Sequence, residues 1–276
     1  ISVSFIQAES ILIKSGTILD GSGENSFEAD ILIDEARIIE IGSRINESKA
    51  EKVIDASDMI VTPGVISPIS NIGVVEINSL DVTTDDESSI YGPGFSIFYA
   101  FNPNSTLIPW NKSYGVTSAI STPGYSNEIF KGMGSYFLLN GKYEITGQQD
   151  IAMYARIGNV RGSRSENIQL MESMLLLAQK LNSENISELL DDNLASSFGL
   201  LEQDIIALNK VAKRELPIVI EVNRAADILQ ALRLKKIFNL DMILMSAEEA
   251  PLVIQQIKDS GVPVIICLLY TSPSPR

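Results

Sequence analysis

Apolar residues recur in short runs along the first quarter of the chain, and polar turns such as Leu19-Asp-Gly-Ser-Gly23 separate the runs. Runs of this length, partly alternating with polar positions, are typical of strands with one buried face. The pattern predicts a small β-sandwich over residues 11–64. The predicted strands are residues 11–18, 29–33, 38–41, 53–54 and 59–62.

The pattern changes at Pro63-Gly64, where one extended segment ends and another, residues 65–72, follows at once. Proline removes a backbone donor and glycine relaxes the steric limits on the backbone, so the pair indicates a hinge between two sheets. We therefore place a domain boundary after residue 64. Residues 80–94 are polar and rich in glycine and proline, which predicts a long loop.

Helical periodicity begins at Ser163, which forms an S-x-x-E capping box with Glu166. Amphipathic helices then alternate with buried strands, an order that implies βαβ units and a parallel sheet. A barrel of eight strands needs ~250 residues, and roughly 200 follow Pro63. We therefore expect an α/β protein with an incomplete (β/α)8 TIM-like barrel over residues 65–266. The later helices are 204–213, 225–238 and 248–260, and the strands are 218–222, 242–245 and 262–266.

Composition narrows the possible partners. The chain has 276 residues, of which 45% are hydrophobic and 20% charged, as in a globular protein. Its formal charge of −14 opposes binding to nucleic acid or anionic membranes. No apolar run approaches the ~20 residues of a membrane span. The chain contains no histidine, so the commonest zinc ligand and the commonest general base are both absent.

Both ends of the chain depart from this picture. The first residue is Ile1, and residues 1–10 resemble the end of a secretory signal peptide cleaved after Ala8, which predicts a periplasmic or exported protein. An ordinary first strand in a cytoplasmic protein is the alternative. Residues 267–276 resemble translated sequencing-adapter sequence at the end of a metagenomic fragment. The single cysteine, Cys267, lies there, and we assign it no role.

The segment Val61-Thr-Pro-Gly-Val-Ile66 resembles the barrel entry of the amidohydrolase superfamily, whose pattern is V-T-P-G-hydrophobic-I-D-x-H-x-H. The order of strands and turns in residues 11–64 is similar to the N-terminal composite domain of that superfamily. Residues 105–117 resemble a divergent subgroup related to imidazolonepropionase. The resemblance implies a TIM barrel, a small-molecule substrate and a divalent metal, usually zinc.

The resemblance also locates four positions where the family has metal-binding histidines. They fall on Ile69, Asn71, Glu221 and Ser246, and the final metal-binding aspartate would lie past Ile266. Zinc activates water when three or four N, O or S ligands hold it with one position open. One carboxylate among these residues does not make such a site, so we predict no metal ligands.

Glu221 is the candidate catalytic residue, as a general base or the sole protein ligand of a metal. The candidate ligand-binding residues are Asn71, Asn223, Arg224 and Ser246. Among them, Arg224 is the candidate anchor of a ligand carboxylate, because an arginine pairs bidentately with carboxylates. The alternative reading makes Glu221 a strand-end carboxylate paired with Arg224 or a neighbouring lysine. In that reading Asn223 caps a helix and Arg224 is a surface charge.

Two function classes follow. The resemblance implies a hydrolase acting on carbon–nitrogen bonds, non-peptide or cyclic amide, with a degenerate metal centre. The lost ligands favour a non-catalytic barrel that binds a small molecule or a protein partner.

Two further segments receive structural interpretations. Lys131–Ser135 is rich in glycine but lacks the ending of a P-loop, so we expect a turn, and Asp85–Glu87 is expected to be a solvated acidic loop.

Overall fold

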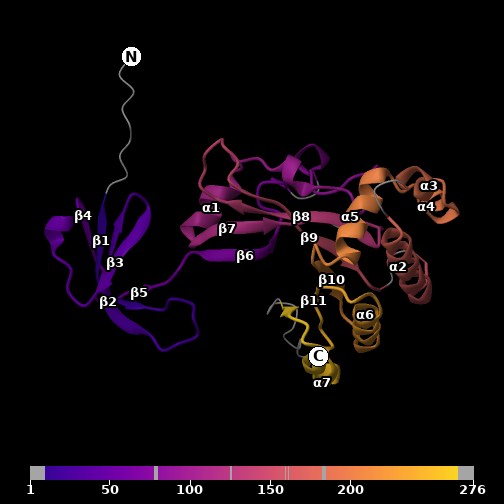
Figure 1. Ribbon diagram of the computed structural model, residues 1–276. Helices are drawn as coiled ribbons and strands as arrows, with labels where there is room; N and C mark the ends of the chain where they lie inside the picture. The colour runs from indigo at the N-terminus through magenta and orange to yellow at the C-terminus, as the bar shows by residue number, and fades with distance from the viewer. Residues whose placement is uncertain are drawn as a thin grey trace, which may run out of the picture. The chain divides into compact units, whose positions relative to one another are not determined.

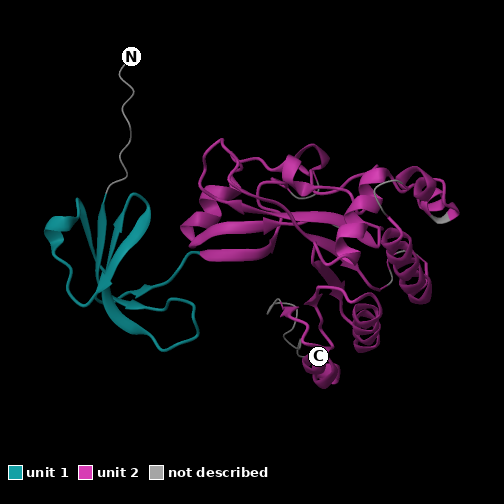
Figure 2. Ribbon diagram, viewed as in Figure 1, with its two compact units in different colours: residues 1–64 teal, residues 65–276 magenta. Residues whose placement is uncertain are grey.

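The computed structural model describes residues 10–77, 80–124, 126–158, 160, 162–181 and 185–266. The residues interpreted as a signal-peptide remnant, apart from Ser10, and the adapter-like tail lie outside these ranges. The chain divides into two compact units, residues 1–64 and 65–276 (Figure 2). In the described ranges, no helix is both long enough and apolar enough to cross a membrane.

The first unit is a five-stranded sheet around β1 (Ile11–Ile18) (Figure 1). On one side, β1 pairs antiparallel with β2 (Phe27–Asp34), which pairs antiparallel with β3 (Arg37–Gly42). On the other side, the start of β1 pairs in parallel with β4 (Lys52–Asp55), and its end pairs in parallel with β5 (Ile60–Val61).

Each face of this sheet has its own small core. Leu12 and Leu32 are cross-strand partners and pack with Ile45. Ile31 packs in a separate cluster with Ile18. Because neighbouring residues on a strand point to opposite faces, the two clusters lie on opposite sides of the sheet. The strands predicted as a sandwich therefore form a single sheet that buries side chains on both faces.

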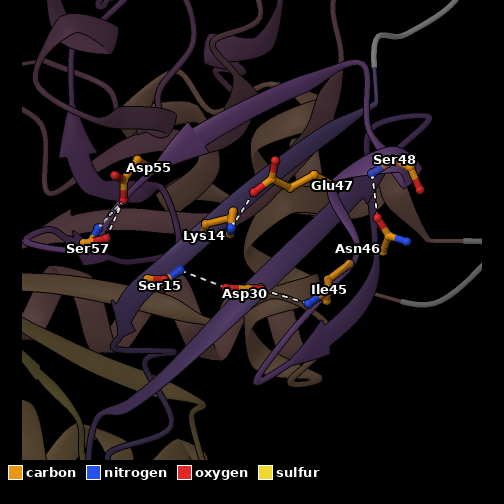
Figure 3. A network of polar contacts seen from close by, with 9 residues as sticks. All are labelled: Lys14, Ser15, Asp30, Ile45, Asn46, Glu47, Ser48, Asp55 and Ser57. Carbon is orange, nitrogen blue, oxygen red and sulfur yellow. Dashed lines mark hydrogen bonds and ion pairs between the residues drawn. The ribbon is translucent and has the colours of Figure 1, made fainter.

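Asp30 links the parts of this unit (Figure 3). Its side chain, in β2, is 4% exposed and accepts hydrogen bonds from the Ser15 N–H at 2.9 Å and the Ile45 N–H at 2.8 Å. Ser15 lies at the bulge in β1 and has a positive φ of 57°. The two hydrogen bonds stabilise the charged carboxylate and hold the pKa of Asp30 below its ordinary value.

The second unit is built on a seven-stranded sheet in the order β12-β11-β10-β9-β8-β7-β6. Every strand except β8 runs in the same direction, since only the β7–β8 and β8–β9 pairs are antiparallel. The carboxyl ends of the parallel strands therefore meet at one edge, together with the start of β8. The strands are β6 (Val65–Ser70), β7 (Val116–Ser121), β8 (Phe130–Leu138), β9 (Gly147–Arg156), β10 (Ile218–Val222), β11 (Met242–Ser246) and β12 (Val264–Ile265).

Most helices of the second unit follow β9, and α1 alone of the described α-helices precedes β7. The α-helices are α1 (Leu107–Ser113), α2 (Arg164–Gln179), α3 (Ile186–Leu190), α4 (Asn193–Phe198), α5 (Glu202–Ala212), α6 (Ala225–Phe238) and α7 (Ile254–Ser260). Short 3-10 helices of this unit are η2 (Asp81–Thr83), η3 (Ile97–Ala100) and η4 (Ala250–Val253), and the first unit has η1 (Glu47–Lys49). The capping box predicted at Ser163 and Glu166 is present at the start of α2. The main core joins α2, α5 and α6 to β9, β10 and β11.

The prediction of a turn at Lys131–Ser135 was wrong, because this segment lies inside β8. Its glycines serve close packing. A Cβ on Gly132 would lie 2.7 Å from the Phe95 carbonyl oxygen, and one on Gly134 would overlap the Tyr154 ring. The sheet therefore contains one antiparallel strand, β8, whereas the sequence predicted a parallel sheet. The sequence pattern also missed β9 and the short helices α3 and α4.

Candidate functional site

A pocket of about 160 Å³ lies at the carboxyl ends of β9 and β10, where α2 and α6 begin. It brings together three of the five predicted site residues, Glu221, Asn223 and Arg224. Its remaining lining is Arg156, Ile157, Gly158, Arg164, Val222 and Asp227. Strand ends are the usual place for active groups in barrels.

Glu221 is held between two cations. The Lys131 Nζ lies 2.9 Å from one carboxylate oxygen, and the Arg156 Nε lies 3.7 Å from the other. The side chain of Lys131 is 9% exposed and that of Glu221 is 22% exposed, so the pair is largely removed from water. The alternative reading of Glu221 named a neighbouring lysine as its partner, and Lys131 is that lysine. Both oxygens of this carboxylate therefore face cations of the chain itself.

Asn223 and Arg224 follow β10 directly. The Asn223 Oδ1 is buried and has no hydrogen-bond partner. Arg224 is exposed and, in the described part of the chain, its guanidinium has no carboxylate partner. Neither side chain caps α6, because the Ala225 N–H donates to the Glu249 carboxylate at 2.8 Å. Both groups remain available to a ligand.

A second ion pair borders the pocket. The Arg164 Nε, in the first turn of α2, lies 3.1 Å from the Asp227 carboxylate in the first turn of α6. Asp227 is buried while Arg164 is partly exposed. The pocket thus carries three arginines and two carboxylates, which gives it a net positive charge.

Ser246 and Asn71 do not line this pocket. Ser246 ends β11, in register with Val222, and both Ser246 and Ala247 have positive φ values, 70° and 47°. Such values are uncommon for residues other than glycine and cluster at functional sites. Asn71 follows β6 at the opposite edge of the sheet, and β7, β8 and β9 lie between it and β10.

Sequence reasoning missed Lys131, because its strand was taken for a turn, and it missed Asp86, because its loop was taken for solvated. Asp86 and Lys131 line one small cavity beyond the end of β7. Burial is the main cause that raises the pKa of Asp86, with repulsion from Glu87 and Asp85 adding to it, whereas a backbone hydrogen bond and, less strongly, attraction to Lys131 lower it. Gly124 makes this placement possible, because a Cβ there would overlap the Asp86 carboxylate.

Comparison with curated proteins finds similarity to enzymes of one broad class, although no protein-family profile matches the chain. Dihydropyrimidinase 2 of Caenorhabditis elegans is 27% identical over 193 residues, which cover 64% of this chain and 36% of that protein. A dihydroorotase of Streptococcus pyogenes is 45% identical over 56 residues, 20% of this chain and 13% of that protein. The chain thus spans little more than a third of the dihydropyrimidinase and a smaller part of the dihydroorotase.

Comparison with solved structures points to the same class of protein. An amidohydrolase from Thermotoga maritima MSB8 superposes with a TM-score of 0.77 over 94% of this chain and 70% of that protein, at 20% identity. The chain has the amidohydrolase fold. The motif around Pro63-Gly64 and the matches to dihydropyrimidinase and dihydroorotase are the sequence resemblance that accompanies this fold.

The amidohydrolase fold implies a zinc site, and the residues at its positions do not fit one. Ile69 has no donor atom, Asn71 and Ser246 are weak neutral ligands, and Glu221 is already paired with Lys131. Within the described residues, no group of three or more aspartate, glutamate or cysteine side chains could hold a metal ion. We derive no reaction step through a metal.

Proposed function

We propose that this protein binds a small molecule carrying a carboxylate or carbonyl group, using the amidohydrolase scaffold as a binding site without a resident zinc. The observation that carries the proposal is that Glu221, in a pocket lined by three arginines, is already paired with Lys131. The carboxylate expected to act as base or metal ligand is neutralised within the protein. The arginines leave the pocket suited to an anion.

The groups around the pocket suggest how the ligand is held. Among the described residues, the Arg224 guanidinium has no carboxylate partner, and its fork matches the two oxygens of a ligand carboxylate. Asn223 contributes a buried amide oxygen without a partner, which an N–H donor on the ligand would satisfy. A molecule with a carboxylate beside an amide or ureido N–H meets both requirements.

Binding can be measured by calorimetry on the intact protein, with N-carbamoyl and N-acyl amino acids and cyclic amides as ligands and a chelator in the buffer. We expect Arg224→Gln to weaken the binding of a carboxylate ligand by about tenfold or more, since it removes a charge-assisted pair worth ~1.5–3 kcal/mol. The matched control is Arg233→Gln in α6, the helix that follows Arg224, and this arginine pairs with Glu172 outside the pocket. Equal binding by both variants contradicts the proposal.

A second candidate function is hydrolysis of a carbon–nitrogen bond, such as that of a cyclic amide. Similarity to dihydropyrimidinase and dihydroorotase supports it, as does the resemblance of residues 105–117 to the imidazolonepropionase-related subgroup. In this case Glu221 would have to exchange its contact with Lys131 for a water molecule within about 3 Å. Turnover by the intact protein that Glu221→Gln abolishes would support this candidate, and turnover unchanged by Glu221→Gln would remove Glu221 from the reaction.

A further inference from the structure

Arg224 lies in a stretch of main chain that one other residue holds on both sides. The carbonyl of Asn223 belongs to the peptide group before Arg224, and it accepts a hydrogen bond from the Glu249 N–H at 2.9 Å. The N–H of Ala225 belongs to the peptide group after Arg224, and it donates to the Glu249 carboxylate at 2.8 Å. Glu249 therefore binds both peptide groups that flank Arg224.

These two hydrogen bonds restrict the backbone of Arg224. Because peptide groups are planar, holding both of them leaves little freedom to the φ and ψ angles of the residue between them. Arg224 has a φ of −75° and a ψ of 140°, and it directly precedes α6. Its side chain is exposed, so little packing restrains it. The backbone angles, which also decide the allowed rotamers, are therefore what directs the guanidinium.

The turn after β11 brings Glu249 to this position. Ser246 and Ala247 have positive φ values of 70° and 47°, which such residues keep only where the surrounding structure holds them. Here the Ala247 N–H donates to the Val222 carbonyl at 2.8 Å, at the end of β10. Two residues later, the Glu249 N–H bonds to Asn223. The turn thus follows the main chain of β10 beyond the end of that strand.

We propose that Glu249 is a positioning residue for the ligand pocket, holding the backbone around Arg224 so that the guanidinium is directed at the ligand carboxylate. Ser246, which does not line the pocket, then serves it through the conformation of this turn. The role needs an acceptor oxygen and a backbone N–H at position 249, and it does not need a negative charge. Glu249 has this role only if Arg224 is the anchor, so the proposal rests on the function proposed above.

The test compares, by calorimetry on the intact protein, the binding of an N-carbamoyl amino acid and of its neutral carboxamide. Glu249→Ala should weaken binding of the carboxylate at least about fivefold and of the carboxamide less than about twofold, because only the carboxylate pairs with Arg224. Glu249→Gln should bind as the wild type does, since its amide oxygen still accepts the Ala225 N–H. Glu248→Ala, which removes the exposed carboxylate next to it, is the matched control. In an Arg224→Gln background, Glu249→Ala should have no further effect.

Amide hydrogen exchange of the ligand-free protein checks the backbone contact itself. The Ala225 N–H should exchange faster in Glu249→Ala than in the wild type, and Glu248→Ala should leave it unchanged. Unchanged exchange in Glu249→Ala, or an equal loss of affinity for the carboxylate and the carboxamide, would overturn the proposal. Absence of binding by the wild type would count against the function proposed above, whereas wild-type binding that Glu249→Ala leaves intact would count against the role of Glu249 alone.

Discussion

At the scale of single residues, Asp30 gives this structure a defined pH dependence. Hydrogen bonds from Ser15 and Ile45 lower the pKa of Asp30 in the folded state below its ordinary value of 3.8. The stability they contribute is present in full above that value, and it is lost as the pH falls through the folded-state pKa. Acid should therefore weaken the first unit through this residue.

We expect Asp30→Asn to lower the free energy of unfolding by about 1–3 kcal/mol at pH 7, because a neutral amide is a poorer acceptor for two buried N–H groups. The difference between variant and wild type should shrink below about pH 4. Denaturant unfolding between pH 2 and pH 7 measures it. Asp58→Asn, at an exposed position, is the matched control and should change little. A difference that stays constant down to pH 2 would show that Asp30 titrates normally.

Single site residues were predicted correctly where their neighbours in the sequence decide their position in the fold. Glu221, Asn223 and Arg224 follow a recognisable buried strand, and the structure places them in one pocket. Lys131 could not be found in this way, because its role depends on a partner 90 positions along the chain. Asp86 could not be found either, since its burial depends on the close approach of Gly124.

At the scale of elements, the loop between η2 and η3 is anchored to the start of α5. Asp204, 1% exposed, accepts hydrogen bonds from the N–H groups of Gly92 at 3.2 Å, Gly94 at 2.7 Å and Leu201 at 2.8 Å. The loop therefore approaches the helix closely. A Cβ on Gly94 would lie 2.8 Å from the backbone carbon of Gln203, whereas one on Gly92 would lie 3.8 Å from its nearest neighbour.

Gly94→Ala should consequently destabilise the protein by about 1–3 kcal/mol, the usual cost of overpacking. Gly92→Ala removes a glycine two positions away from the same loop and should cost much less. Thermal melting of the two variants under identical conditions makes the comparison. Equal melting temperatures would mean that the loop moves away from α5 without cost.

Elements with strong local signals were predicted closely. The strands at residues 11–18 and 218–222 and the helix at 225–238 have the predicted bounds. The segment β8 was missed because its glycines were taken for a turn, and β9 was not predicted at all. In the structure, those glycines make room for Phe95 and Tyr154 across the sheet. Contacts of that kind join residues that are far apart in the sequence, so no periodicity of apolar positions indicates them.

At the scale of the whole molecule, the change of pattern at Pro63-Gly64 coincides with the division into two compact units. The strand and helix order predicted an incomplete barrel, and the structure has the amidohydrolase fold with an antiparallel strand within the sheet. A fold leaves its chemistry open. Here the residues at the strand ends form ion pairs where the fold implies metal ligands.

The central claim is that the intact protein binds its ligand without a metal and does not hydrolyse it. Its most direct test follows dihydropyrimidine-type and other cyclic amides by mass spectrometry, with the intact protein in chelator and then with zinc restored. The account predicts saturable binding and no turnover in either condition. Turnover that chelator abolishes and zinc restores would contradict it.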